Sequence, residues 1–237
     1  MSIAGLAKTV ATAAVAALLS SCSALGLERD PTTTIVLIDK SGSIAPEDRE
    51  IFAQSLATIV SQLEGGDRLL IGQVGDEGRS EFRPLLDLIV VRTNVRLDQE
   101  DAVREAQARV SDAIPSILAA DTAGAASSTR ITETIAAAAQ AFGSQPEPGD
   151  RLILLSDGVE ESSIIQLDEG ADAGQIQAAV DRLREVGTLP NLEHTELSVV
   201  GAGGANYGDV EAFWRAYASA SGARLVTYGR LPLQAER

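Results

Sequence analysis

The chain has 237 residues, a length that suits one α/β domain preceded by a short leader and argues against a second full domain. Its 34 acidic and 19 basic side chains give a formal net charge of −15, which would repel phosphate groups, so we expect no nucleic-acid partner. Hydrophobic residues make up 45% of the chain and aromatic residues only 3%, so the core must be built mainly from aliphatic side chains.

The first residues are typical of a signal peptide. Lys8 precedes an apolar run at residues 9–19, which is shorter than the roughly 20 residues that a membrane span needs. The run ends in the letters LSSC, which resemble the lipobox of bacterial lipoproteins. That resemblance implies that residues 1–21 are a lipoprotein signal peptide and that Cys22 becomes the lipid-modified N-terminus of the mature protein.

Cys22 is the only cysteine, so the chain has no intramolecular disulfide. We expect a cell-envelope protein that is anchored to the membrane by lipid, with residues 22–32 as a tether. Ser23 rather than an aspartate follows the cysteine. In a Gram-negative cell, the lipoprotein pattern that this resembles favours the outer membrane.

The remaining chain alternates strand-like and helix-like segments. Residues 34–38 are apolar or β-branched without interruption, which predicts a strand buried on both faces. Pro46, followed by two acidic residues, predicts the start of a helix, and Gly65 and Gly66 predict its end. Pro115 should kink or end the next helix, which starts near Asp98. Further strands are expected at residues 68–74, 85–92, 151–155, 195–200 and 224–228, and further helices at residues 130–142, 173–186 and 210–220.

This alternation predicts an α/β fold, with a doubly wound, mostly parallel six-stranded sheet and helices on both faces. The segment at residues 85–92 is expected to be an antiparallel edge strand. The acidic stretch at residues 160–172 is expected to be an exposed loop, with a short strand considered at residues 164–167. Three aromatic residues recur at helical spacing and should pack in the core: Phe213, Trp214 and Tyr217.

Oxygen-bearing side chains follow two of the predicted strands, at the ends where doubly wound sheets bind ligands. Asp39, Ser41 and Ser43 come directly after the first strand, and alternate residues of an extended turn project to the same side. Asp157 comes after the strand at residues 151–155. If these two strands are neighbours, the two carboxylates meet where the strand order reverses.

Three motifs together resemble the von Willebrand factor A domain: DKSGS after the first strand, SSTRITETI at the start of a helix, and LLSDG after the fourth strand. The resemblance covers residues 33–229 and leaves residues 230–237 as a C-terminal tail. In that family a DxSxS motif, a threonine and an aspartate form a metal-ion-dependent adhesion site. Carried over to this chain, the resemblance implies five ligands: Asp39, Ser41, Ser43, Thr129 and Asp157.

In this site the two serines would coordinate the ion directly, and the two aspartates directly or through water. Thr129 is preferred to Thr132 because Ile131 and Ile135 then fall where the family has a small or apolar residue and the first buried helix position. Such oxygen donors suit Mg²⁺ or Mn²⁺. The remaining coordination position can accept a carboxylate from a protein partner, as in the resembling family.

Enzyme interpretations lack the necessary residues. If Asp39 accepted a phosphoryl group, a second aspartate would be expected two residues later, but Ser41 is there. A Ser-His-Asp hydrolase would need His194, the only histidine, and a GxSxG motif, which the sequence lacks. We therefore expect no catalysis, and a binding module that captures a protein partner through Mg²⁺. The alternative is a scaffold domain of an envelope complex whose ion only stabilises the loops, with a hydrolase a distant third. Glu160 and Glu161 would either tune partner choice or form a solvated acidic loop.

Overall fold

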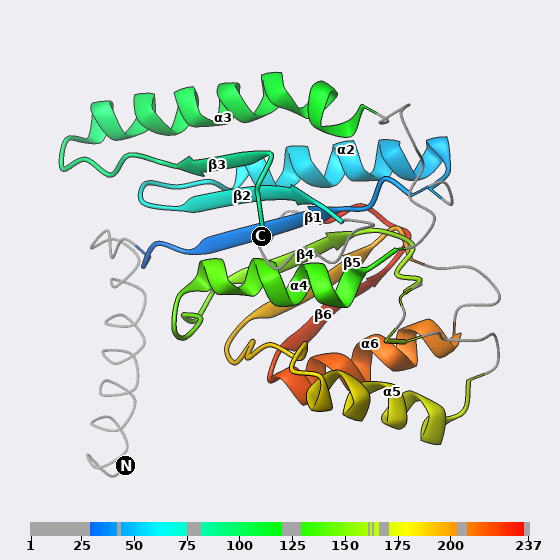
Figure 1. Ribbon diagram of the computed structural model, residues 1–237. Coiled ribbons are helices and arrows are strands. Elements are labelled where there is room, and N and C mark those ends of the chain that lie inside the picture. Colours follow the sequence, from blue (N-terminus) through cyan, green and yellow to red (C-terminus); the bar gives the residue numbers. More distant parts are fainter. Residues whose placement is uncertain are drawn as a thin grey trace, which may run out of the picture. The chain divides into compact units, whose positions relative to one another are not determined.

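Figure 1 shows the computed structural model of the chain. It divides into two units, Met1–Asp30 and Pro31–Arg237, and the second holds every element named below. The structure describes residues 29–41, 44–74, 82–119, 129–160, 162, 164–165, 171–202 and 208–234, so the expected signal peptide and Cys22 lie outside the described residues. In chain order the elements are β1 (Thr33–Ile38), α2 (Pro46–Ser61), β2 (Arg68–Gln73), β3 (Leu86–Ile89), α3 (Arg96–Leu118), α4 (Ile131–Ala139), the short 3-10 helix η2 (Gln140–Phe142), β4 (Arg151–Leu155), α5 (Ala173–Glu185), β5 (Glu196–Val200), α6 (Gly208–Ser221) and β6 (Arg224–Gly229).

The six strands form one sheet in the order β3-β2-β1-β4-β5-β6. Neighbouring strands are parallel throughout, except that β3 pairs with β2 in the antiparallel direction and forms one edge. The strand order reverses between β1 and β4, because the chain builds outward from β1 on one side and from β4 on the other. The predicted doubly wound, mostly parallel α/β sheet is confirmed.

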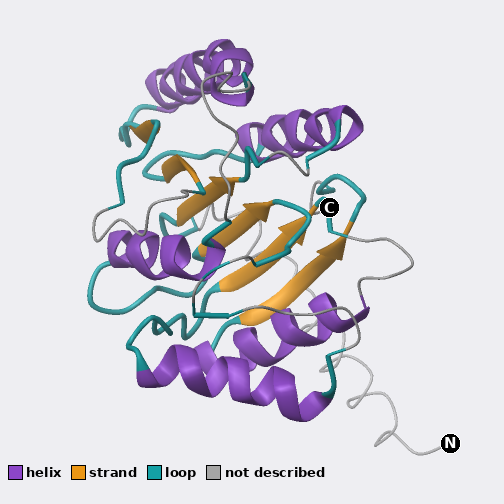
Figure 2. Ribbon diagram, turned by 45° about the vertical axis from the view of Figure 1, so that its right-hand side comes forward, coloured by secondary structure: helices purple, strands orange, loops and turns teal. Residues whose placement is uncertain are grey.

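Helices cover both faces of this sheet, with α2 and α3 on one face and α4, α5 and α6 on the other (Figures 1 and 2). The side chains of β1 divide between the two resulting cores. Ile35 and Leu37 belong to the core under α4, α5 and α6, whereas Val36 and Ile38 belong to the core under α2 and α3. A strand that is buried on both faces needs apolar residues at every position, which explains the uninterrupted apolar run.

Two buried aspartates fix the beginning of β1. Asp67 precedes β2 and accepts a hydrogen bond from the backbone N–H of Thr32, with an N···O distance of 3.0 Å. Asp150 precedes β4 and accepts one from the N–H of Thr33 at 2.7 Å. Each carboxylate also accepts the N–H of the residue three positions before it. The chain therefore enters the sheet between two carboxylate-bound turns at the amino ends of the strands.

Of the two outcomes expected at Pro115, a kink or the end of the helix, the second is wrong, because α3 continues through it to Leu118. Pro115 lies in the last turn, so its missing N–H removes one helical hydrogen bond and few further turns depend on it. The short strand considered at residues 164–167 is not formed at Ile164 or Ile165, and residues 166 and 167 lie outside the described residues.

No helix in the described ranges is long and apolar enough to cross a membrane. The last described residues follow β6 and bind to α2. Arg230 Nε donates to Asp48 Oδ1 at 2.8 Å, and the backbone N–H of Leu233 donates to Ser55 Oγ at 3.1 Å. The beginning of the expected C-terminal tail is therefore attached to the first turns of α2.

The aromatic residues of α6 pack as the sequence predicts. Phe213, Trp214 and Tyr217 have no exposed surface, and the ring centroid of Trp214 lies 5.3 Å from those of both its neighbours in edge-to-face geometry. Trp214 Nε1 also donates to the carbonyl oxygen of Gly158 at 2.9 Å. The helix thus contacts the loop that follows β4, as well as the core.

Replacing Phe213 by Ala should lower the free energy of unfolding by about 3–5 kcal/mol, because it leaves a cavity in a closely packed cluster. Arg215→Ala is the matched control on the same helix. The ion pair of Arg215 with Glu211 is solvent-exposed, so its loss should cost less than about 1 kcal/mol. Urea denaturation measures both, and equal losses would contradict the assignment of Phe213 to the core.

Candidate functional site

The carboxyl ends of β1 and β4 lie side by side, with Ile38 paired to Leu155. The next residue, Asp39, extends this pairing, since its backbone N–H donates to the carbonyl of Leu155 at 2.9 Å. Asp157 follows the end of β4. The condition set by the sequence, that the two strands be neighbours, is therefore met at the point where the strand order reverses.

Ser156 links the two carboxylates. Its side chain is fully buried, and its Oγ donates to Asp39 Oδ2 at 2.7 Å while lying 3.5 Å from Asp157 Oδ1. The same Oγ accepts the backbone N–H of Gly158 at 2.9 Å. Sequence reasoning gave Ser156 no role, although its position between the strand and the Asp-Gly turn was the available signal.

Asp39 is only 3% exposed, and its Oδ1 accepts the backbone N–H of Ser41 at 2.8 Å. Burial raises the pKa of the Asp39 carboxyl, whereas hydrogen bonds from Ser41 and Ser156 lower it and the negative charge of Asp157 raises it further. The second carboxylate is held by the backbone N–H of Val159, which donates to Asp157 Oδ1 at 3.0 Å. Two acids held by neutral donors repel each other, and a bound cation would relieve that repulsion.

Of the other two predicted ligands, Thr129 and Ser43, only Thr129 is among the described residues. Thr129 is 7% exposed and lies two residues before α4. Its helix is tied to the loop after Asp157 by Glu160, so both segments belong to one cluster of loops at this edge of the sheet. Ser43 lies outside the described residues.

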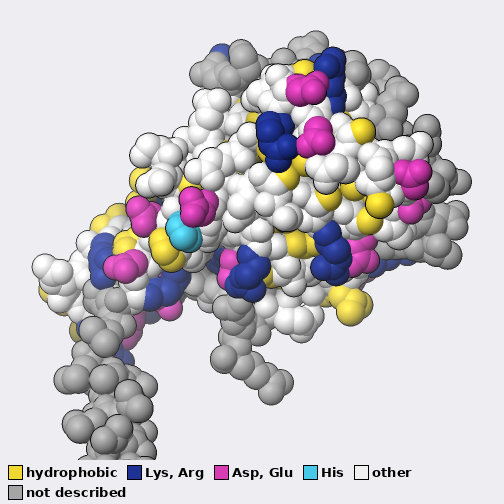
Figure 3. All heavy atoms as spheres, turned by 90° about the horizontal axis from the view of Figure 1, so that it is seen from below, with side chains coloured by type: hydrophobic (Ala, Val, Ile, Leu, Met, Phe, Trp, Pro, Cys, Tyr) yellow, Lys and Arg dark blue, Asp and Glu magenta, His cyan; other side chains and the backbone are white. Residues whose placement is uncertain are grey.

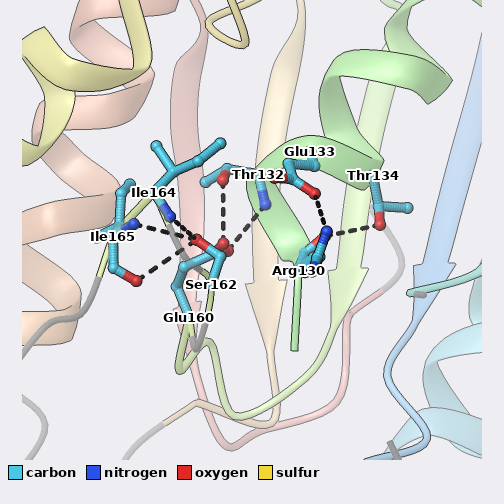
Figure 4. Close-up of polar contacts among 8 residues, drawn as sticks. All are labelled: Arg130, Thr132, Glu133, Thr134, Glu160, Ser162, Ile164 and Ile165. Atoms are coloured by element: carbon cyan, nitrogen blue, oxygen red, sulfur yellow. Dashed lines mark hydrogen bonds and ion pairs between the residues drawn. The ribbon is translucent and has the colours of Figure 1, made fainter. Parts of the chain in front are cut away.

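Glu160 binds the amino end of α4 from a different loop (Figure 4). Its Oε2 accepts the backbone N–H of Thr132 at 2.9 Å, and its Oε1 accepts the Thr132 hydroxyl at 3.2 Å. The N-cap residue of α4, Arg130, makes no side-chain capping bond. Glu160 thus supplies the acceptor that the first turn of a helix needs, at the positive end of the helix dipole.

The expectation of an exposed loop at residues 160–172 is wrong at the beginning of the stretch, although Asp172 at its end is exposed. Glu160 is 2% exposed, Ser162 3% and Ile165 4%. Ser162 Oγ accepts the backbone N–H groups of Ile164 and Ile165 at 3.3 and 3.1 Å, which folds the segment back on itself (Figure 4). The two isoleucines pack against the core, so the segment is buried despite its acidic composition. Glu161 lies outside the described residues.

The donor atoms fit a magnesium-type ion. Within the described ranges, no three His, Cys, Asp or Glu side chains gather as a metal-binding group. An ion at this edge would therefore depend on the carboxylates of Asp39 and Asp157, the hydroxyl of Ser41 and water, with Ser43 and Thr129 as the further donors that the resemblance implies. Mg²⁺ and Mn²⁺ accept such sparse oxygen sets and retain waters, whereas Ca²⁺ takes more protein oxygens.

No protein-family model matches the chain, and no curated protein matches it. Solved structures that resemble it include a von Willebrand factor type A protein from Catenulispora acidiphila, at 15% identity and a TM-score of 0.35, over 81% of this chain and 43% of that one. The human COPII-coat protein Sec24c has 14% identity and a TM-score of 0.45, over 86% and 30% of the two chains. The PilB minor pilin from Streptococcus sanguinis has 11% identity and a TM-score of 0.43, over 85% and 58%. The chain thus spans less than two thirds of each, and these values support no conclusion about ligands or partners.

Glu160 should make the stability of the domain depend on pH. Burial raises the pKa of Glu160 from 4.5 to about 7, against the hydrogen bonds from Thr132, Ser162 and Ile131, which lower it. Burial raises the pKa of the neighbouring Tyr217 hydroxyl, and the negative charge of Glu160 raises it further. A carboxyl whose pKa is higher in the folded state stabilises the fold below its unfolded pKa, and this contribution is lost as the pH rises through about 7. The loss corresponds to at most about 3 kcal/mol.

Glu160→Gln removes this titration and keeps an acceptor for Thr132. Between about pH 5 and about pH 8, unfolding of the parent chain should require progressively less denaturant, whereas the variant should change much less. Glu185→Gln, an exposed residue at the end of α5, is the control and should follow the parent. Parallel pH profiles for the parent and Glu160→Gln would refute the assignment.

Proposed function

We propose that this chain is an extracytoplasmic, lipid-anchored binding module resembling a von Willebrand factor A domain, which captures a protein partner through Mg²⁺ or Mn²⁺. The observation that carries the proposal is the joining of Asp39 and Asp157 through Ser156 at the switch point of the sheet. Both residues come from parallel strands that the sequence places far apart. Their shared position is where doubly wound folds bind ligands.

Electrostatics favours a cation at this position. Asp39 is almost fully buried, and the charge that acts on its carboxyl is the negative charge of Asp157. Little water separates such groups, so their repulsion is stronger than it would be in bulk solvent. An ion bound here would offset the repulsion. A coordination position left to the outside would then accept an oxygen from a partner, for which a carboxylate is the natural anionic ligand.

The proposal assigns no catalysis to the chain. His194 lies in the loop before β5, with 58% of its side chain exposed. That loop is at the amino ends of the parallel strands, whereas Asp39 follows a carboxyl end. A five-residue strand rises roughly 17 Å, so the imidazole stands too far from the carboxylates to act as their acid or base.

Asp39→Asn and Asp157→Asn should abolish the heat of Mg²⁺ or Mn²⁺ binding at millimolar ion, because each removes one of the two charges. Asp150→Asn is the matched control: it removes a buried aspartate at the other end of β4. That variant should lose about 1–3 kcal/mol of stability through an imperfectly paired backbone N–H and bind the ion as the parent does. Titration calorimetry measures binding, and circular dichroism checks that all three variants fold.

The ion should also stabilise the parent domain, by about 2.7 kcal/mol at an ion concentration a hundred times the dissociation constant. A parent chain without measurable binding at millimolar ion would overturn the metal site itself.

Capture of a partner separates the binding module from the scaffold alternative. The folded protein is incubated with envelope extract in Mg²⁺ or in chelator, and the bound proteins are identified. Capture should require the ion and be lost in Asp39→Asn and Asp157→Asn, while Asp150→Asn retains it. If a partner binds equally well in chelator, the ion only stabilises the loops and the scaffold interpretation takes its place.

Lipid anchoring is tested at Cys22. Mass spectrometry of the native protein should find a mature N-terminus at Cys22 that carries acyl chains, and Cys22→Ala should leave an uncleaved or mislocalised precursor. An unmodified peptide that begins upstream of Cys22 would disprove the anchor and leave the metal site unaffected.

A further inference from the structure

Exposed apolar side chains concentrate on one short part of the described chain. Eight large hydrophobic residues are exposed in the described ranges as a whole, and five of them fall within residues 85–97. Leu85, 52% exposed, comes just before β3, and Ile89, 63% exposed, ends it. Val91 (63%) and Val95 (54%) lie between β3 and α3, and Leu97 (71%) lies in the first turn of α3. In the view of Figure 3, acidic, basic and hydrophobic side chains are interspersed over the visible face.

The segment at residues 91–97, called the apolar loop below, is held in a defined shape by Gln99. The side-chain amide of Gln99 accepts the backbone N–H of Thr93 at 2.8 Å and donates to the carbonyl of Val91 at 3.1 Å. The backbone N–H of Gln99 also donates to the carbonyl of Val95 at 2.9 Å. The loop therefore presents Val91, Val95 and Leu97 outward on a fixed frame, which lowers the entropy lost when such a surface binds.

The apolar loop lies at the end of the sheet where the chain enters. Ile89 pairs with Arg68, the first residue of β2, which in turn pairs with Thr33, the first residue of β1. The turn before β2 connects both segments: Thr32 N–H donates to Asp67, and Gly66 N–H donates to the carbonyl of Val90 at 2.9 Å. A Cβ on Gly66 would lie 2.8 Å from Pro31, which shows how closely that turn approaches the entering chain.

From this placement we infer that the apolar loop is a lipid-contacting surface, which orients the anchored domain with its amino-end edge toward the membrane and its carboxylate site away from it. The inference rests on the proposed anchor at Cys22. Pro31 is nine positions after Cys22, and a fully extended chain over nine steps reaches at most about 30 Å. The entry edge of the domain, and the apolar loop with it, must then stay close to the lipid surface.

The composition of the loop suits this occupant. Two exposed arginines, Arg92 and Arg96, alternate with the apolar side chains, and Arg96 forms an exposed ion pair with Glu100 at 2.8 Å. The arginine stem can contact apolar surface while the charged end stays at headgroup level. A second copy of the chain is a poorer occupant. A stable protein interface takes about 20–30 residues a side, far more than the loop and the four-residue edge strand β3 provide.

The test uses the mature lipidated chain in vesicles of phosphatidylcholine and phosphatidylethanolamine. Lipidation consumes Cys22, the only cysteine, so Leu97→Cys supplies a unique thiol for an environment-sensitive dye. Its emission should shift to shorter wavelength in vesicles and be quenched by nitroxide groups on the lipid chains. Ala173→Cys, exposed at the start of α5 and at the carboxyl-end edge, is the matched control and should keep the emission of a dye in water.

Adding Val91→Asp and Val95→Asp to the Leu97→Cys chain should abolish the shift and leave the fold intact, because both side chains are exposed. A dye at Leu97→Cys that stays in water on a chain whose Cys22 is lipidated would overturn the inferred orientation and leave the anchor standing. A shift that also occurs in detergent and resists nitroxide lipids would mean a protein contact, and would overturn it as well. A Cys22 without lipid overturns both the anchor and the orientation, and metal binding, measured separately, is unaffected by either result.

Discussion

The parallel pairing of β1 with β4 is the contact on which the candidate site depends. It brings Asp39 and Asp157 to neighbouring strand ends, where one carboxylate is almost fully buried. Their repulsion is strong in such surroundings, and the fold tolerates it because the hydroxyl of Ser156 and backbone N–H groups donate to the two carboxylates. Hydrogen bonds from neutral donors stabilise each charge separately but do not neutralise the pair. Two carboxylates at this position make the fold less stable than two apolar residues would. A cation between the carboxylates is the simplest way to offset that loss of stability.

Two buried contacts transmit the packing of the helices to this site. Trp214 of α6 donates to the carbonyl of Gly158, directly after Asp157, and Glu160 caps the first turn of α4, directly after Thr129. Gly158 has a φ of +80°, and a Cβ added there would lie 3.0 Å from Trp214 Nε1, so a side chain at this position would be both strained and crowded. The loop after β4 is therefore attached to one helix at Gly158 and to a second at Glu160. The carboxylate of Asp157 is consequently placed by the core, even though it lies on a loop.

The sequence predicts those features that follow from burial and chain direction. A strand buried on both faces must be apolar throughout, so β1 and β4 are recognisable. Residues directly after parallel strands share one edge, so Asp39 and Asp157 were expected to meet if the two strands were neighbours, and the sequence did not show that they are. Features that depend on a single tertiary contact could not be predicted from the sequence. Nothing in the sequence distinguishes Glu160 from the other acidic residues of this stretch, and only the position of α4 shows that it caps a helix. Likewise, whether Pro115 ends a helix depends on how many turns remain after it, which composition does not reveal.

The opposed positions of the apolar loop and the carboxylate site follow from the parallel sheet itself. In such a sheet all parallel strands begin at one edge and end at the other, so the segment that leads into β1 and the residues that follow β1 and β4 must lie at opposite edges. Six residues of β1 separate these edges by roughly 20 Å. An attachment before β1, as proposed at Cys22, would therefore direct the carboxyl ends of the strands away from the membrane. The antiparallel strand β3 runs in the opposite direction and so returns the chain to the edge where β1 begins. The exposed side chains of Val91, Val95 and Leu97 follow it there.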